Sequence, residues 1–369
     1  MPPVWVDHQN TFEKMIADLL AHSRVAVDTE SNSLHAYREQ VCLIQFSTPT
    51  TDYILDPFAF EDLSALGPLF SDPKIEKIFH AAEYDLICLK RDFDYSFANL
   101  FDTMYAARIL GYPFVGLDNM LAEKLDIKVD KRHQKADWAA RPLTASQIDY
   151  ARFDTHYLFQ LRDILEKELE EKGRLQLAHE DFVRACTIEL PKEKVNGASW
   201  GRFSSRKDVS TRELTILREL CAFRDEVAER MDRPPFKVVD DDMLLSIARN
   251  LPEKDVDLAG IGLSPKQIRL WGEDILAAVR HGVDAQLVER ETAKRPHDAT
   301  LRRLEKLKNW RKVQAKESGV ESDIVLPKAY LNLLAENPPK SMEQLESLLT
   351  DSPSRFQQYG KQILKVLGG

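Results

Sequence analysis

The chain has 369 residues, more than one hydrophobic core usually holds, so we expect two or three domains. Hydrophobic residues at 43% and charged residues at 30% are typical of globular proteins, and no apolar run is long enough to cross a membrane. The net charge of −9 is uneven, because residues 1–200 hold 22 Lys and Arg against 33 Asp and Glu, whereas residues 201–369 hold 29 against 27. A surface for phosphate contact is therefore expected in the second half, with a solvated helical surface as the alternative.

The first 15 residues lack the continuous apolar core of a secretion signal. The four cysteines are far apart and form no C-x-x-C pair, which argues against a zinc site or a disulfide framework. They are Cys42, Cys88, Cys186 and Cys221. Their apolar surroundings suit buried free thiols in a reducing compartment, so we expect a cytoplasmic protein.

Short apolar runs broken by turn residues predict four strands in the first half. These are Val25–Asp28, Val41–Phe46, Tyr53–Leu55 and Ile75–Phe79. Helical patterns follow at residues 85–90, 103–110 and 117–125. Strands interleaved with helices indicate an α/β sheet domain.

One long helix should close this domain. Thr144 followed by Gln147 has the pattern of a capping box at its start, and Lys172 followed by Gly173 marks its end. Another helix is expected at about residues 178–190. Residues 191–208 combine Pro, Gly, Ser and Asn with scattered charge, which predicts a connector.

The remainder is helical and repeats itself at a shift of 87 residues, which a one-residue slip extends to 88. The helical periods cover residues 214–231, 241–249, 266–279 and 301–315. Matched pairs include Phe223 with Trp310, Arg224 with Arg311, Leu244 with Leu331 and, at the longer shift, Trp271 with Tyr359. The pattern predicts two small helical domains built from one ancestral module.

Acidic residues mark the end of the first predicted strand. Asp28 and Glu30 are two residues apart, so both lie on one face and can share a metal ion. Such pairs are common at strand ends, and this one is a weak signal alone. Asp85 follows in the first turn of a predicted helix, where a carboxylate usually interacts with the helix dipole.

Tyr150 and Asp154 are four residues apart on the capped helix, on the face that continues through Leu158. Asp154 should therefore point inward. A buried carboxylate requires a cation or a fixed hydrogen-bond partner. A divalent metal would satisfy it, but Arg108 or Arg152 could do so too.

Four converging carboxylates would suit a pair of magnesium or manganese ions, since both favour oxygen ligands. Two such ions about 4 Å apart can activate a water on one side of a phosphodiester and stabilise the leaving oxygen on the other. This chemistry needs no nucleophilic side chain. The sequence offers no phosphate loop, nucleophile elbow or HExxH motif.

At these positions the chain resembles ribonuclease D and the DEDD family of 3′-to-5′ exonucleases. Asp28 and Glu30 fit the first family motif, His80, Tyr84 and Asp85 the second, and Tyr150 and Asp154 the third. Residues 101–103 and 137–143 also resemble family segments, and the helical repeats resemble HRDC domains, which are thought to contact nucleic acid. Tyrosine four residues before the last aspartate is typical of one of the two family branches.

The resemblance implies that two divalent ions, Mg²⁺ or Mn²⁺, are held by Asp28, Glu30, Asp85 and Asp154. It also implies that Tyr150 orients the attacking water, since a phenol with a pKa near 10 is a poor base at neutral pH. Basic residues before the catalytic helix are candidates for phosphate binding, with a solvated loop as the alternative. They are Lys131, Arg132, Lys135 and Arg141.

The expected architecture is a ribonuclease H-like α/β exonuclease domain with a mixed sheet and flanking helices at residues 1–200, followed by two all-α HRDC domains at residues 209–283 and 297–369. The expected function is hydrolysis of RNA from its 3′ end with release of nucleoside 5′-monophosphates, acting as a monomer on tRNA precursors and other structured RNA. One alternative is a 3′-to-5′ DNA exonuclease. Another is a nucleic-acid-binding protein that is not an enzyme.

Overall fold

The computed structural model describes residues 2–190, 198–290 and 296–368. It divides into two compact units. The first combines residues 1–31, 41–190 and 296–369, and the second combines residues 32–40 and 191–295. Among the described residues, no helix has the length and apolar character needed to cross a bilayer.

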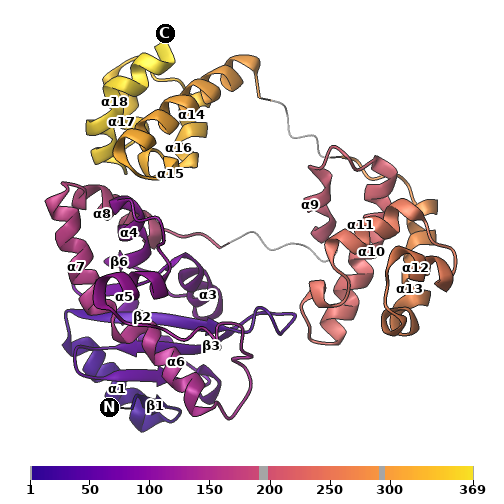
Figure 1. Ribbon diagram of the computed structural model, residues 1–369, viewed down its shortest axis with the longest axis horizontal. Coiled ribbons are helices and arrows are strands. Elements are labelled where there is room, and N and C mark those ends of the chain that lie inside the picture. The colour runs from indigo at the N-terminus through magenta and orange to yellow at the C-terminus, as the bar shows by residue number, and fades with distance from the viewer. Residues whose placement is uncertain (1, 191–197, 291–295, 369) are drawn as a thin grey trace. The chain divides into compact units, whose positions relative to one another are not determined.

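A six-stranded mixed sheet with the order β1-β4-β3-β2-β5-β6 forms the centre of the first unit (Figure 1). The strands are β1 (Val4–Val6), β2 (Arg24–Ser31), β3 (Val41–Ser47), β4 (Asp52–Leu55), β5 (Glu76–Phe79) and β6 (Leu100–Asp102). β3 runs antiparallel to β2 and β4, and the other neighbours are parallel. The four predicted strands are confirmed. The sequence missed β1 and β6, since three residues are too few to show a period of two.

Helices flank this sheet, as the fold prediction required. They are α1 (Gln9–Ala21), α2 (Gly67–Ser71), α3 (Glu83–Phe93), α4 (Thr103–Leu110), α5 (Leu117–Leu125), α6 (Ala145–His156), α7 (Leu158–Glu171) and α8 (Leu175–Cys186), with short 3₁₀ turns at Pro57–Ala59 and Ser64–Leu66. The prediction of one long closing helix is wrong, because the chain breaks at Tyr157 (φ −101°, ψ 2°). α6 packs on β2, β3 and β4, whereas α7 packs on α4, α5 and β5, and one straight helix cannot serve both surfaces.

The second unit contains the first helical repeat. Its elements are a 3₁₀ turn at Ala198–Trp200, α9 (Gly201–Ser204), α10 (Thr211–Arg230), a 3₁₀ turn at Pro235–Lys237, α11 (Asp241–Asn250), α12 (Asp255–Ile261) and α13 (Pro265–Asp284). Part of the predicted connector at residues 191–208 is helical, because α9 lies within it. Phe203 of α9 is buried in the core of this repeat. Its residues 191–197 lie outside the described residues.

The second repeat is formed by α14 (Asp298–Ser318), α15 (Ser322–Val325), α16 (Lys328–Glu336), α17 (Met342–Leu348) and α18 (Pro353–Gly368). Equivalent arginines make equivalent bonds in the two repeats. Arg224 donates to the carbonyl of Val239 at 3.1 Å, and Arg311 donates to the carbonyl of Leu326 at 2.8 Å. The two arginines are 87 residues apart, and so are the two carbonyl groups that accept their hydrogen bonds, which confirms the internal duplication.

The second repeat packs on the sheet domain within the first unit. Arg174, which follows α7, donates to the carbonyls of Ile109 at 2.7 Å and Ser318 at 2.8 Å, so it joins the C-terminal ends of α4 and α14. The helices end there at Gly111 and Gly319, both with positive φ. A Cβ on Gly111 would collide with the carbonyl oxygen of Gly319, so this approach requires glycine.

Candidate metal-binding active site

α6 crosses the sheet over β2, β3 and β4 (Figure 1). Three carboxylates meet at this crossing. Asp28 and Glu30 lie on one face of β2, opposite Gln45 and Leu43 of β3. Asp154 faces them from α6, and one oxygen of each of the three carboxylates lies within 4.8 Å of the others. Side chains alternate between the two faces of β2, so Asp28 and Glu30 lie on the same face. Asp154 completes the group from its position on α6.

α6 is fixed on the sheet by polar contacts on either side of Asp154. The hydroxyls of Thr155 and Ser47 share a hydrogen bond of 2.7 Å. Arg152 and His156 contact the carboxylate of Asp52 at 2.9 and 2.8 Å. At the helix start, Thr144 and Gln147 form the predicted capping box, which confirms the helix start.

The two arginines considered as partners of Asp154 are committed elsewhere. Arg152 pairs with Asp52, and Arg108 pairs with Glu321 and Asp323 at 2.6 Å each. Within residues 2–190, 198–290 and 296–368, the structure records no ion pair for Asp154. It records none for Asp28 or Glu30 within these ranges either. A cation from solution, or protonation of the carboxyls, can then compensate this group of charges.

Asp85 reaches the same place from the first turn of α3. Its carboxylate accepts the backbone N–H of Thr29 at 3.1 Å and also the Thr29 hydroxyl, so it is tied to β2 between Asp28 and Glu30. The charge of Asp85 raises the pKa of the other three carboxyls. Asp85 belongs neither to the three-carboxylate group nor to the pocket lining, but its charge acts on all three carboxyls.

Asp102 holds the turn that leads to Asp85. It is buried and accepts the backbone N–H groups of Ala81 and Ala82 as well as those of Met104 and Tyr105. The same carboxylate thus joins the start of α3 to the start of α4. Asp102, the acidic residue of the segment 101–103, therefore has a role in the fold.

Burial is the largest cause of the pKa shifts at this site. It raises the pKa of Asp85 and Asp154 to about 7, and it raises the pKa of Asp28 and Glu30 well above the ordinary carboxyl range. The neighbouring negative charges add to the shift at Asp28, Glu30 and Asp154. A partly buried cluster that offers only oxygen donors and whose members repel one another fits a hard divalent cation.

Tyr150 lies one turn before Asp154 and stacks on Trp138, with ring centroids 5.9 Å apart. Burial and then the charges of Asp154, Glu30 and Asp28 raise the pKa of its hydroxyl far above neutral pH. The Tyr150 hydroxyl therefore keeps its proton in the folded protein. It can hydrogen-bond a water molecule but cannot act as a base.

A pocket of about 350 Å³ opens over the carboxylates and is also lined by His80, Met104 and Tyr150. Lys131 lines it and pairs with Asp118 at 2.7 Å.

The other three basic candidates do not line the pocket. Arg132 is exposed and pairs with Asp130 at 2.6 Å, and Lys135 also lies outside the lining. Arg141 donates to both carboxylate oxygens of Asp56, at 2.7 and 2.8 Å, and is thereby committed to the fold.

Sequence reasoning overlooked Gln45, the neighbour of Asp28 across the β2–β3 ladder. Gln45 has no exposed surface, and neither polar atom of its side chain has a hydrogen-bond partner within the part of the chain that the structure describes. A carboxamide buried without a partner is costly. The signal was present in the sequence, because Gln45 interrupts the apolar run Val41–Phe46.

Comparison with known proteins gives the family of each part. Residues 3–170 match the 3′-5′ exonuclease family, and residues 213–279 and 300–367 each match the HRDC domain. The chain carries a 3′-5′ exonuclease domain followed by two HRDC domains. Both repeats found in the sequence are thus HRDC domains.

Relatives with this exonuclease domain include proteins of the RRP6 type. The exosome complex exonuclease RRP6 of Saccharomyces cerevisiae is 32% identical over 276 residues, covering 70% of this chain and 37% of that protein. The exosome complex component 10 homolog of Caenorhabditis elegans is 34% identical over 264 residues, covering 70% of this chain and 30% of that protein. The chain therefore spans about a third of the length of these relatives.

Solved structures of related proteins have a similar fold. The catalytic core of RRP6 from Trypanosoma brucei superposes with a TM-score of 0.67 at 29% identity, covering 78% of this chain and 81% of that one. Escherichia coli RNase D superposes with a TM-score of 0.69 at 24% identity, covering 95% of this chain and all of that one. The likeness to RNase D is thus one of fold, whereas RRP6-type proteins are also similar in sequence.

Proposed function

We propose that this protein is a 3′-to-5′ exoribonuclease that hydrolyses RNA from its 3′ end and releases nucleoside 5′-monophosphates. The observation that carries the proposal is the group formed by Asp28, Glu30 and Asp154, which lies in one pocket with Tyr150. RNA is favoured over DNA by the relatives, since RNase D of Escherichia coli is described as an exoribonuclease and the RRP6 proteins belong to exosome complexes.

Asp28, Glu30, Asp85 and Asp154 would hold two divalent cations, Mg²⁺ or Mn²⁺. Such ions supply a water activated for attack and stabilise negative charge on the leaving oxygen. Their binding is favoured because neighbouring negative charges raise the pKa of Asp28, Glu30 and Asp154, so a cation relieves repulsion that the fold alone leaves in place.

The chain's own groups then orient the substrate. The Tyr150 hydroxyl, which keeps its proton, holds the attacking water in line with the phosphorus atom through a hydrogen bond. Lys131, the candidate cation that lines the pocket, contacts a phosphate near the scissile bond. Arg132, Lys135 and Arg141 would at most contact RNA farther from the carboxylates.

We further propose structured RNA 3′ ends, including those of tRNA precursors, as substrates. Escherichia coli RNase D, which shares the fold, is described as acting in structured RNA processing. An exosome-type assembly is a second candidate context, favoured by the RRP6-type relatives. The cysteines favour the cytosol, because none of the four, all in the described part of the chain, forms a disulfide and three of them are buried.

The test is timed digestion of 5′-labelled RNA and DNA oligomers of one sequence, each with a 3′ hydroxyl or a 3′ phosphate. The expected result is stepwise shortening of the RNA with a free 3′ hydroxyl, release of 5′-monophosphates, and no reaction in chelator. Faster digestion of the DNA oligomers would mean that the protein is a DNA exonuclease. Absence of digestion with both Mg²⁺ and Mn²⁺ would contradict the proposal altogether.

A further inference from the structure

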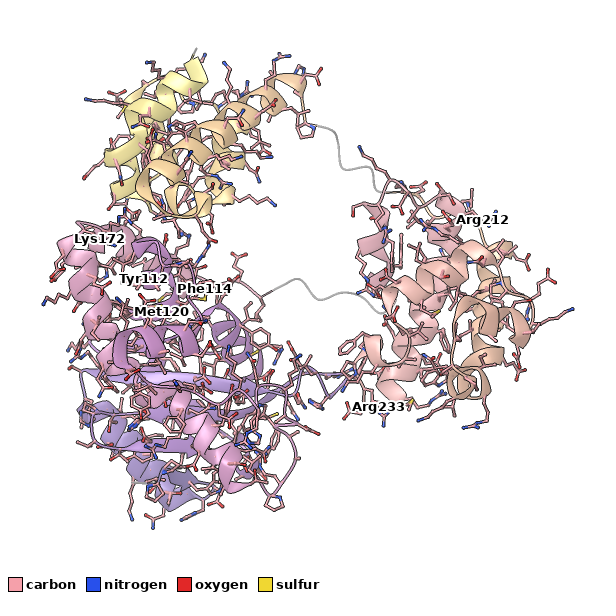
Figure 2. All side chains as sticks on the ribbon, in the orientation of Figure 1. Tyr112, Phe114, Met120, Lys172, Arg212 and Arg233 are labelled. Atoms are coloured by element: carbon pink, nitrogen blue, oxygen red, sulfur yellow. The ribbon has the colours of Figure 1, made fainter. Side chains whose placement is uncertain are left out.

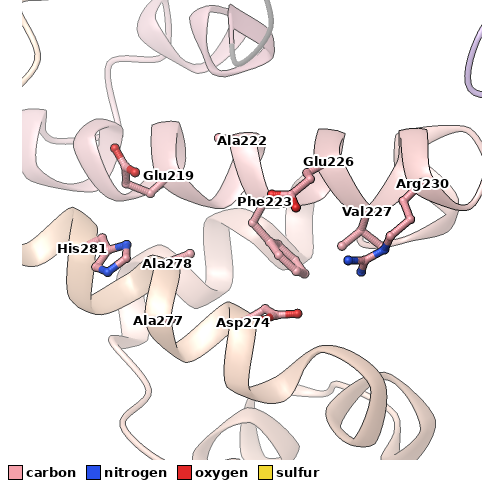
Figure 3. A pocket seen from close by; sticks show the side chains of 10 residues that line it. All are labelled: Glu219, Ala222, Phe223, Glu226, Val227, Arg230, Asp274, Ala277, Ala278 and His281. Carbon is pink, nitrogen blue, oxygen red and sulfur yellow. The ribbon is translucent and has the colours of Figure 1, made fainter.

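The first HRDC domain has a groove of about 320 Å³ between α10 and α13. Its floor is apolar and includes Phe223, Val227 and Ala278. Figure 3 shows the Phe223 ring reaching from α10 toward α13, with Glu226 on its own helix and Asp274 on the facing helix. The groove therefore combines an aromatic surface with carboxylates on both sides.

In the second HRDC domain the residues at the equivalent positions contact each other. Trp310 occupies the position of Phe223, and its indole N–H donates to Gln362 at 2.9 Å. Gln362 corresponds to Asp274 at the shift of 88 residues. Phenylalanine has no N–H group, so in the first domain the facing carboxylate of Asp274 receives no such donor.

The helices cannot close this groove by moving together. Beside the groove, a Cβ on Gly282, the residue after His281 of the lining, would lie 2.6 Å from Ile216 Cα, so the two backbones are already in contact there. Arg212 (Figure 2) then ties α10 to the end of α13, donating to the carbonyls of Val283 and Ala285 at 2.9 and 3.0 Å. The groove is thus preformed.

Its charge favours a cation. The lining holds three carboxylates, of Glu219, Glu226 and Asp274, against the one guanidinium of Arg230. Glu219 pairs with Arg218 at 2.7 Å. For Glu226 and Asp274 no hydrogen bond or ion pair is recorded among the residues that the structure describes.

The two HRDC domains also differ in overall charge. Residues 201–290 hold 15 Lys and Arg against 17 Asp and Glu, whereas residues 301–369 hold 12 against 8. A phosphate backbone would be repelled by the carboxylates of the groove, so RNA is disfavoured there.

We propose that this groove is a docking site for a partner protein, which inserts an arginine from a basic segment. The guanidinium would stack on Phe223 and donate to Glu226 and Asp274, in the place where the second domain uses the N–H of Trp310. The apolar stem of the arginine would cover Val227. This inference does not depend on the catalytic site.

The test uses the full chain and two fluorescein-labelled peptides of about 12 residues, one with arginines spaced by leucine and serine and one with every arginine replaced by glutamine. Fluorescence anisotropy reports binding. Two single-charge changes provide the comparison. Phe223→Trp combined with Asp274→Gln copies the Trp310–Gln362 pair and should close the groove, whereas Glu253→Gln removes one exposed carboxylate that does not line it.

We expect the arginine peptide to bind wild type at least tenfold more tightly than the glutamine peptide. The double variant should lose at least tenfold in affinity, and Glu253→Gln should keep it. Glu226→Gln, on the surface, should lose affinity too and serves if the double variant does not fold. Equal binding of both peptides, or equal loss in Glu253→Gln, would overturn the proposal. So would a 20-nucleotide RNA that binds wild type and is lost in the groove variants.

Discussion

Arg355 of the second HRDC domain forms an ion pair with Asp181 of α8 from which water is excluded. The Arg355 guanidinium has no exposed surface and donates to Asp181 at 2.9 Å and to Glu180 at 3.0 Å. Ile324 of the same HRDC domain belongs to the hydrophobic core of the exonuclease domain. The second HRDC domain is therefore built into the folded catalytic domain.

Replacing Arg355 by methionine should destabilise this unit by about 3 to 5 kcal/mol, because it leaves the buried Glu180 carboxylate without a counter-charge and Asp181 with Arg184 alone. Chemical denaturation followed by circular dichroism measures the loss. Arg302→Met is the matched control, since Arg302 is exposed on the same domain, and its change should stay within about 0.5 kcal/mol. Similar values for both variants would mean that the ion pair does not hold the domains together.

Removal of residues 209–369 should lower the melting temperature of the exonuclease domain. The cut takes away Arg355 and Ile324 and exposes the surface that they cover. Differential scanning calorimetry of the full and shortened chains measures the effect. A shortened chain that melts at the temperature of the exonuclease transition in the full chain would show that the packing contributes little.

Patterns within a single strand or helix were enough to predict which site residues share a face. The alternation along β2 placed Asp28 and Glu30 on one face, and the helical period placed Tyr150 and Asp154 together. Partners distant in sequence were not readable. Arg141 was a candidate for phosphate binding, but its guanidinium is held by Asp56, 85 residues earlier in the chain.

The same limit applies to the two HRDC domains. The repeat in the sequence makes them look equivalent, and only the contacts distinguish them. The second domain carries Arg355, and the position that corresponds to it in the first domain, at the shift of 88 residues, is Gln267. Periodicity reports which face of a helix is apolar, but it does not report which surface that face will meet.

Asp154→Asn should lower the rate of RNA hydrolysis by at least about a thousandfold while the protein stays folded. The variant removes one buried charge from a group whose members repel one another, so the metal-free protein should melt at the same or a higher temperature. Gel-based digestion and thermal melts measure both effects. Glu61→Gln, an exposed change elsewhere in the domain, should leave both unchanged. Activity of Asp154→Asn close to that of wild type would remove this residue from the site.

Divalent ions should stabilise the folded protein through the same carboxylates. At about 100 times the dissociation constant, Mn²⁺ or Mg²⁺ should add about 2.7 kcal/mol to the free energy of unfolding. The melting temperature should therefore rise on addition of the ion, fall back with chelator, and respond much less in Asp154→Asn. An equal rise in wild type and Asp154→Asn would place the binding of the ion elsewhere on the protein.

Tyr150→Phe tests the hydroxyl separately from the ring. The variant keeps the packing on Trp138 and loses only the hydroxyl, which we propose orients the attacking water. Losing one such bond should reduce turnover by about ten- to a thousandfold, with no change in RNA affinity measured in Ca²⁺ or with chelator. Because burial is the largest cause that raises the pKa of Tyr150, wild-type turnover should not fall through loss of the tyrosine proton between pH 7 and about 9. Unchanged turnover in the phenylalanine variant would mean that Tyr150 contributes only its ring to the site.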